Sequence, residues 1–298
     1  MAFDLPVDIE DSIVYLNGSF LPMREARIPV LDRGFIFGDG VYEVIPVYGR
    51  RPFRLAEHLH RLQYSLDGIR LANPYPDSEW SRLILELVAR CPHDNQGLYL
   101  QVTRGVAKRD HAFPKGVKPT VFMMTNALST PSPEMVANGV AAITAADNRW
   151  TRCDIKSIAL LGNVLMRQLA VDAGANETIM LRDGHLTEGS ASNVFTVRGG
   201  IIVTPPKSNL ILPGTTYDVV LELAKKAGMP VEVRPVTETE LRSADEIWIT
   251  SATREVLAVN LLDGKPVGTG TPGPIFQRMH TLFREFKAQL AAGAPSHA

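Results

Sequence analysis

Two short stretches of the sequence combine residue types that could carry out chemistry on a carbonyl group. Residues 152–157 read RCDIKS and place Lys156 just ahead of an apolar stretch. A lysine that is withdrawn from water has a lowered pKa, so its amine becomes a nucleophile toward an aldehyde. Residues 186–193 read LTEGSASN and contain Glu188, a carboxylate that could keep a pyridine nitrogen protonated. A Schiff-base lysine and an acidic partner are together what pyridoxal 5'-phosphate needs to act as an electron sink.

Each candidate residue also has an ordinary interpretation. Lysine and glutamate are rarely buried unless they are paired, so Lys156 and Glu188 could equally be solvated surface residues. Arg61 lies beside the apolar face of a predicted helix and is either a solvated arginine or a phosphate ligand. Residues 214–216 (GTT) and 251–253 (SAT) offer amide and hydroxyl donors to a phosphate, but an ordinary N-cap and an ordinary turn have similar sequences.

The composition favours a small-molecule partner. Lys plus Arg (31) nearly balance Asp plus Glu (32) in the 298 residues, so neither nucleic-acid binding nor a membrane-surface patch is indicated. No apolar stretch reaches the ~20 residues that a membrane helix requires. Neither the 2 cysteines nor the 7 histidines show the spacing of metal ligands, so we expect no metal site. The N-terminal stretch MAFDLPVDIEDS lacks the apolar core of a signal peptide, and we expect a reduced, cytoplasmic protein.

Chain length and one proline-containing stretch predict two domains. A chain of 298 residues exceeds what one compact core usually holds. Residues 126–134 (NALSTPSPE) contain two prolines and small polar residues without periodicity, which is typical of a linker. We place a small N-terminal α/β domain at residues 1–128, the linker at 129–134 and a larger C-terminal domain at 135–298.

The spacing of apolar residues predicts a mixed α/β (α+β) structure. Asn-Gly at 17–18 and Asp-Gly at 183–184 lie between apolar runs and indicate tight hairpins. Helices are expected from residue 56 onward and over residues 79–89, 158–172 and 274–290, with the SHA tail frayed. Strands over residues 177–181, 193–197 and 201–204, joined by tight turns, predict an antiparallel meander. Thr237 and Glu240 have the spacing of a capping box.

Five ordered motifs together resemble one family along almost the whole chain. They read DRG with FGDGVYE (residues 32–34 and 37–43), HLHRL (58–62), QVTRG (101–105), CDIKS (153–157) and TEGSASNVF (187–195). By these motifs the chain is identified as a member of the fold-type IV, or class-IV, pyridoxal-phosphate aminotransferases, and it resembles the D-amino acid (D-alanine) aminotransferases among them. The resemblance implies two domains, the larger with mainly antiparallel strands in a pseudo-barrel surrounded by helices.

The resemblance also implies roles for individual residues. Lys156 matches the lysine that forms an aldimine with the cofactor and then moves a proton between substrate and cofactor. Glu188 matches the carboxylate that pairs with the pyridine nitrogen, and Leu212 matches the residue packed against the pyridine ring. The cofactor phosphate is matched by Arg61, Thr215, Thr216, Ser251 and Ala252. The family's usual hydroxyl falls on Ala252, so Ser251, Thr253 or backbone amides would have to replace it. Asn163 stands where relatives vary between small and aromatic residues.

For the substrate, Tyr42 matches a tyrosine that grips the α-carboxylate together with an arginine and a histidine, which are matched by Arg109 and His111. In the family these last two come from the neighbouring subunit, which implies a homodimer with shared active sites. An arginine fork binds a carboxylate bidentately, and histidine adds a donor. Fixing the carboxylate on one side decides which enantiomer presents its Cα–H to Lys156.

We therefore expect ping-pong transfer of an amino group from a D-amino acid to a 2-oxo acid, with D-alanine and 2-oxoglutarate giving pyruvate and D-glutamate. Other reactions stay open on the same scaffold: a branched-chain L-amino acid transaminase, an (R)-amine transaminase, and a lyase that removes pyruvate from aminodeoxychorismate. The pair Arg109 and His111 argues against the first of these. A non-catalytic cofactor-binding protein is disfavoured by the presence of both Lys156 and Glu188.

Overall fold

The computed structural model describes residue 9 and residues 11–293, and its contacts divide the chain into two compact units. Of the described residues, the first unit contains those up to Ser129, the segment Ile155–Leu160 and residues 290–293. The second contains Thr130–Asp154 and Leu161–Gln289. The expected absence of a signal peptide and the expected fraying of the SHA tail concern residues that lie at least in part outside the described ones. The domain bounds drawn from the sequence, 1–128, 129–134 and 135–298, stay a prediction.

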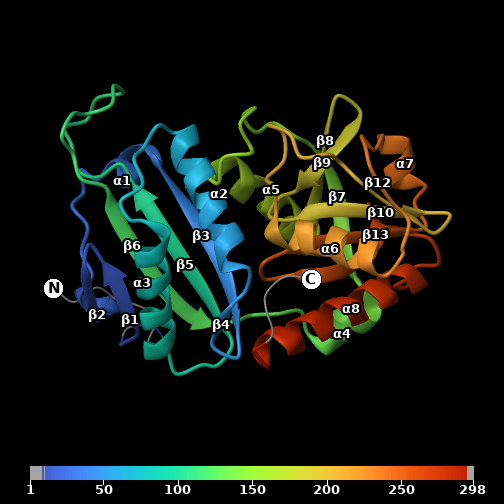
Figure 1. Ribbon diagram of the computed structural model, residues 1–298. Coiled ribbons are helices and arrows are strands. Elements are labelled where there is room, and N and C mark those ends of the chain that lie inside the picture. The colour runs from blue at the N-terminus through green and yellow to red at the C-terminus, as the bar shows by residue number, and fades with distance from the viewer. Residues whose placement is uncertain (1–8, 10, 294–298) are drawn as a thin grey trace. The chain divides into compact units, whose positions relative to one another are not determined.

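The first unit is built on a six-stranded antiparallel sheet in the order β2-β1-β6-β5-β3-β4 (Figure 1). Its strands are β1 (Ile13–Leu16), β2 (Ser19–Pro22), β3 (Gly40–Tyr48), β4 (Arg51–Pro52), β5 (Gln96–Thr103) and β6 (Thr120–Ala127). Helices α2 (Leu55–Gly68) and α3 (Asp77–Arg90) cover one face, where their apolar residues form a core with the strands. A short 3-10 helix, η1 (Met23–Glu25), and the short helix α1 (Arg33–Phe37) precede β3.

The segment Ile155–Leu160 belongs to the first unit although both of its flanks belong to the second. Strand β4 pairs with only the last residues of β3, so the beginning of that sheet edge accepts another segment. There the Tyr42 N–H donates to the Lys156 carbonyl at 2.9 Å, and the Ile158 N–H donates to the Gly40 carbonyl at 3.1 Å. Helix α5 (Leu161–Asp172) therefore begins at Leu161 rather than at residue 158, because the preceding residues are engaged at this edge.

The second unit contains a mixed nine-stranded sheet in the order β12-β11-β10-β13-β14-β7-β8-β9, with β15 on β14. Its strands are β7 (Val140–Ala146), β8 (Glu177–Arg182), β9 (His185–Gly189), β10 (Asn193–Arg198), β11 (Ile201–Thr204), β12 (Val231–Val233), β13 (Glu246–Ser251), β14 (Glu255–Leu262) and β15 (Lys265–Pro266). Most neighbours are antiparallel, but β12 is parallel to β11, and β7 is parallel to both of its neighbours.

The predicted meander is wrong at one junction. Strands β8 and β9 form a hairpin, and so do β10 and β11, but no ladder joins β9 to β10 within the described residues. The chain turns sharply between them, because the Gly189 N–H donates to the Ser192 carbonyl at 2.7 Å and the Ser190 N–H donates to the Thr178 carbonyl at 2.9 Å. This turn follows Glu188 and separates β9 from β10, so the two strands do not form the continuous ladder of a meander.

Aromatic side chains join the second sheet to its helices. These helices are α4 (Pro133–Asn138), α5, α6 (Thr215–Lys226), α7 (Glu238–Arg242) and α8 (Pro274–Ala291). Phe195 lies opposite Trp248 in the ladder between β10 and β13, and these rings meet Tyr217 of α6 and Phe276 of α8. The capping box of α7 is confirmed, because the Thr237 and Glu240 side chains bond reciprocally to backbone N–H groups. No helix in the described part of the chain is long and apolar enough to span a bilayer.

The apolar face of α5 is exposed in the single chain. The predicted periodicity is correct, but Leu161, Val164, Leu165 and Leu169 are 72, 59, 56 and 43% exposed. A row of large apolar side chains along one helix face is typical of a protein–protein contact.

Candidate active site

Lys156 is held in place through its backbone. Its carbonyl accepts from Tyr42, as described above, and its N–H donates to the hydroxyl of Ser65, a buried residue of α2, at 3.1 Å. The Nζ atom lies 4.2 Å from the centre of the Tyr42 ring, within the range of a cation–π contact. The Tyr42 ring in turn stacks on Tyr99 at 5.7 Å between centroids. The structure thus brings together two of the predicted site residues, the lysine and the tyrosine.

Arg61 lies on α2 and is buried against a carboxylate. Its Nε and Nη2 atoms donate to Glu43 of β3 at 2.8 and 2.7 Å, and His58 Nδ1 lies 2.7 Å from the same carboxylate. Burial opposes ionisation of Glu43, but Arg61 and His58 hold its pKa down at about 2. Burial also lowers the pKa of His58, against the pull of Glu43. The ionised Glu43 therefore fixes the plane of the Arg61 guanidinium.

Glu188 lies in the second unit, on β9, and is buried. Burial raises its pKa to about 7, and Arg149 opposes this shift. Arg149 Nη1 donates to Oε1 at 2.6 Å, while the Leu212 N–H and Asn193 Nδ2 donate to Oε2 at 3.0 and 3.2 Å. Asn193 Nδ2 also donates to the Leu212 carbonyl at 2.9 Å. Two of the predicted site residues, Glu188 and Leu212, are thus joined directly.

The sequence did not predict the two residues that hold Glu188 in place, Arg149 and Asp147. Arg149 Nε and Nη2 each donate to Asp147 at 2.9 Å, so one guanidinium joins two buried carboxylates. Burial opposes ionisation of Asp147, but the hydrogen bonds from Arg149 lower its pKa to about 2. The Thr187 hydroxyl adds a hydrogen bond to Asp147 at 2.9 Å. The only sequence signal was an aspartate two residues before an arginine, just ahead of the lysine motif.

The predicted phosphate residues of the second unit lie at a helix start and a strand end. Helix α6 begins at the buried residues Thr215 and Thr216, and its N-cap, Gly214, contributes no side-chain hydrogen bond. A Cβ at Gly214 would collide with the side chain of Asn193, which lies opposite Thr250 in the β10–β13 ladder. Within the described residues the Thr250 hydroxyl is buried without a hydrogen-bond partner.

The turn after β13 contains the other two predicted phosphate residues. The Ser251 hydroxyl accepts from the Arg254 N–H at 3.1 Å and closes the turn around Ala252. Ala252 lacks the hydroxyl that the resemblance implies at this position. Two hydroxyls are its neighbours in the chain: that of Ser251, and that of Thr250, which has no hydrogen-bond partner within the described residues. A helix N-terminus and a buried hydroxyl without a partner are features that suit an anion.

Arg109 and His111 lie on the loop between β5 and β6. Both are exposed, and both approach the ring of Phe37 on α1: the Arg109 guanidinium carbon lies 5.2 Å and the His111 ring centre 5.3 Å from its centroid. Within the described chain no hydrogen bond, ion pair or ring contact joins either residue to Tyr42. The chain therefore gathers the arginine and the histidine, but not the whole predicted carboxylate site.

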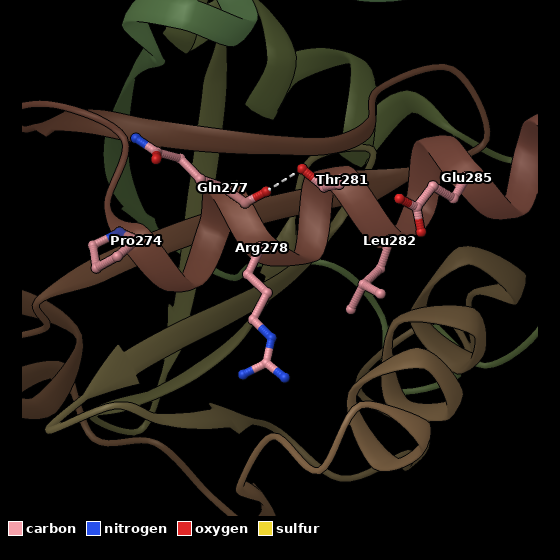
Figure 2. A pocket seen from close by; sticks show the side chains of 6 residues that line it. All are labelled: Pro274, Gln277, Arg278, Thr281, Leu282 and Glu285. Carbon is pink, nitrogen blue, oxygen red and sulfur yellow. Dashed lines mark hydrogen bonds between the residues drawn. The ribbon is translucent and has the colours of Figure 1, made fainter.

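A surface pocket on α8 lies apart from all of these residues in the sequence. It is lined by Pro274, Gln277, Arg278, Thr281, Leu282 and Glu285 (Figure 2). The Thr281 hydroxyl donates to the Gln277 carbonyl at 2.9 Å, and Arg278 donates to the Ala227 carbonyl at 2.8 Å. None of the predicted site residues lines this pocket.

The chain belongs to the class IV aminotransferases, because the family model described as amino-transferase class IV matches residues 40–262. It is 44% identical over 271 residues to the D-alanine aminotransferase of Bacillus licheniformis, covering 91% of this chain and 95% of that protein. It is 39% identical to the D-alanine aminotransferase of Staphylococcus aureus (strain MW2), covering 92 and 97%. The T.th. branched-chain amino acid aminotransferase, solved with pyridoxamine 5'-phosphate, has a similar structure, with a TM-score of 0.89, 29% identity and coverage of 94 and 95%.

These similarities confirm the family, the fold type and the aminotransferase class predicted from the motifs. Enzymes of this class use pyridoxal 5'-phosphate, which confirms the cofactor. The described residues fit that group: a buried carboxylate with a raised pKa lies on one strand, and a helix start and an unpartnered hydroxyl suit a phosphate.

Proposed function

We propose that the protein transfers the amino group of D-amino acids to 2-oxo acids, with D-alanine and 2-oxoglutarate giving pyruvate and D-glutamate. The observation that carries the proposal is the pairing of Arg109 and His111 on Phe37. A guanidinium fork with a neighbouring imidazole suits an α-carboxylate. The names of the relatives from Bacillus licheniformis and Staphylococcus aureus support the same substrate class.

Pyridoxal 5'-phosphate, when bound, supplies the electron sink for the amino group transfer. In the proposal, Lys156 holds the cofactor through its amine and moves the proton at the substrate Cα. Glu188 binds the pyridine nitrogen, and its burial makes a shared proton favourable because the charged carboxylate is poorly solvated there. Leu212 packs on the ring. The phosphate is bound by Arg61, Thr215, Thr216 and the turn at Ser251 and Ala252.

The active enzyme is proposed to be a homodimer in which each subunit lends Arg109 and His111 to the other. The exposed apolar face of α5 supports this assembly, as does the lack of contact between those two residues and Tyr42 in the described chain. A cytoplasmic location is proposed because Cys91 and Cys153 are both buried free thiols, which persist in a reducing compartment.

The test is amino transfer to 2-oxoglutarate from the D and L forms of alanine and leucine, and to pyruvate from the D and L forms of glutamate, with purified holoenzyme. D-Alanine should react, and L-alanine should not. Lys156→Ala should abolish both the reaction and the yellow, lysine-linked absorption band, whereas Lys226→Ala, on the exposed end of α6, should change neither. Full activity of Lys156→Ala, or a holoenzyme whose band does not respond to D-alanine, would contradict the assignment.

A branched-chain L-amino acid aminotransferase is the second candidate. It is favoured by the similarity in structure to the T.th. branched-chain enzyme, at a TM-score of 0.89. The same substrate set separates the two, because preference for L-leucine over D-alanine would establish this candidate and reject the first.

A further inference from the structure

The β5–β6 loop (residues 104–119) presents Arg109 and His111 and is tied to the first unit at its base. The side chains of residues 108–113 are exposed, so the loop has few apolar contacts of its own to fix its position. Three charged residues fix it: Arg33 at the start of α1, Asp39 just after α1, and Arg104, the first residue of the loop after β5.

One carboxylate oxygen joins the two arginines. Asp39 Oδ2 accepts from Arg33 Nε at 2.7 Å and from Arg104 Nε at 2.8 Å. The three side chains are 12, 4 and 7% exposed, in the order Asp39, Arg33, Arg104. Burial opposes ionisation of Asp39, but hydrogen bonds from Arg104 and Arg33 lower its pKa. The ionised carboxylate thus holds two buried guanidinium groups that would otherwise repel each other.

The arginines use their remaining N–H groups to grip the loop. Arg33 Nη1 donates to the Asp110 carbonyl at 2.5 Å and to the Ala112 carbonyl at 3.4 Å, and these two residues flank His111. Arg104 places its guanidinium carbon 3.8 Å from the ring centre of Phe113. Arg104 also donates to the Ile69 carbonyl at 2.7 Å, which ties it to the end of α2.

The Phe37 ring, which Arg109 and His111 approach, is positioned by the same cluster of charged residues. Phe37 lies at the end of α1, the helix that begins with Arg33, and the Arg33 guanidinium carbon lies 4.8 Å from the Phe37 ring centre. Gly38, with φ of 67°, then turns the chain so that Asp39 returns to Arg33. The backbone on both sides of His111, and the ring under His111 and Arg109, therefore depend on one ion cluster.

We propose that Asp39 is a positioning residue for the substrate carboxylate, acting through Arg33 and Arg104 on the loop that carries Arg109 and His111. The inference rests on the proposed function, in which these two residues bind the α-carboxylate in the partner's active site. Asp39 itself touches neither substrate nor cofactor. Its effect appears in the subunit opposite to the one in which it resides.

The first experiment compares Asp39→Ala and Asp39→Asn holoenzymes with wild type. Asp39→Ala should raise the KM for D-alanine about tenfold or more with kcat within about twofold, because charge-assisted hydrogen bonds that fix the binding pair are lost. Asp39→Asn keeps an acceptor oxygen and should show a smaller rise. Asp67→Ala, an exposed aspartate on α2, is the matched control and should leave KM unchanged. Equal KM values for wild type and both Asp39 variants would overturn the proposal.

A second measurement does not depend on activity. Trypsin cleaves after Lys108 and Arg109, and a released loop should be cut about tenfold faster in Asp39→Ala than in wild type or Asp67→Ala. Equal cleavage rates would overturn the proposal. If the wild-type enzyme does not use D-alanine, the proposed function fails, while the cleavage rates still decide whether Asp39 holds the loop.

Hybrid dimers test whether the effect crosses the interface. A subunit with Lys156→Ala is paired with a subunit with Asp39→Ala, so that the only lysine-bearing site receives its loop from the subunit with an intact Asp39. The KM for D-alanine should return to the wild-type value. A KM that stays as high as in the Asp39→Ala homodimer would show that Asp39 acts within its own subunit and would overturn the proposal.

Discussion

Replacing Arg149 with methionine tests the support behind the cofactor carboxylate. Arg149 joins Asp147 and Glu188 through three hydrogen bonds of 2.6 to 2.9 Å, and the side chains of the three residues are 6, 0 and 6% exposed. Methionine fills most of the same volume but removes the charge. Two carboxylates would then remain in a buried site without the cation that joins them.

The expected decrease in the free energy of unfolding depends on whether each carboxylate has another cation nearby or can take up a proton. Removing one partner of a buried ion pair costs about 3–5 kcal/mol. Asp147 keeps a second cation, Arg182, whose Nη2 lies 3.2 Å from its Oδ1, and Glu188 already has a raised pKa of about 7 and takes up a proton readily. Both effects limit the damage, so we expect a loss near the lower end, about 3 kcal/mol.

The assay is urea unfolding of the cofactor-free protein, followed by far-UV circular dichroism. Lys207→Met is the matched control, because Lys207 and Asp218 form an ion pair whose side chains are 47 and 37% exposed, and such pairs contribute about 0.2–1 kcal/mol. A loss for Arg149→Met no larger than that of the control would refute the view that this arginine holds two buried charges.

Two further predictions concern pH and assembly. The pKa of Glu188 is about 7 in the folded chain and 4.5 ordinarily, so the folded state binds the proton more tightly, and the stability of the cofactor-free protein should fall by about 3 kcal/mol as the pH rises from 4.5 to 7. Glu188→Gln should abolish this part of the slope in urea unfolding at a series of pH values, and an unchanged slope would place the titration elsewhere. Leu165→Glu, on the exposed face of α5, should convert dimers to monomers in sedimentation velocity, whereas Lys226→Glu should not; a dimeric Leu165→Glu protein would exclude this face from the interface.

Local sequence signals predicted the elements that depend on near neighbours. The turn at Asn17 and Gly18 has φ of 48 and 99°, as a tight hairpin requires, and the capping box at Thr237 closes within one helical turn. The five ordered motifs, with Lys156 in one and Glu188 in another, together predicted the cofactor without any structure. These features are readable because the interacting groups lie a few residues apart or recur as a fixed pattern.

The features that sequence did not predict depend on long-range contacts between polar groups. Arg33 binds the carbonyl of Asp110, which is 77 residues away, and Arg149 binds Glu188, which is 39 residues away. An arginine that will be buried does not differ in sequence from a solvated one. The apolar row on α5 was read correctly as a helix face, but periodicity alone does not say whether the same chain or another one covers it.

The path of the chain through the first unit bears on the order in which the protein folds during synthesis. The edge of β3 is completed by Ile155–Leu160, so the sheet edge of the first unit waits for residues made after Thr130–Asp154, the first segment of the second unit. N-terminal units generally fold first as the chain emerges. Here the first-made unit finishes only when the lysine segment docks beside Tyr42. The reactive amine is therefore brought to its place by a late step in the folding of the first unit, when the strands that hold it have already been made.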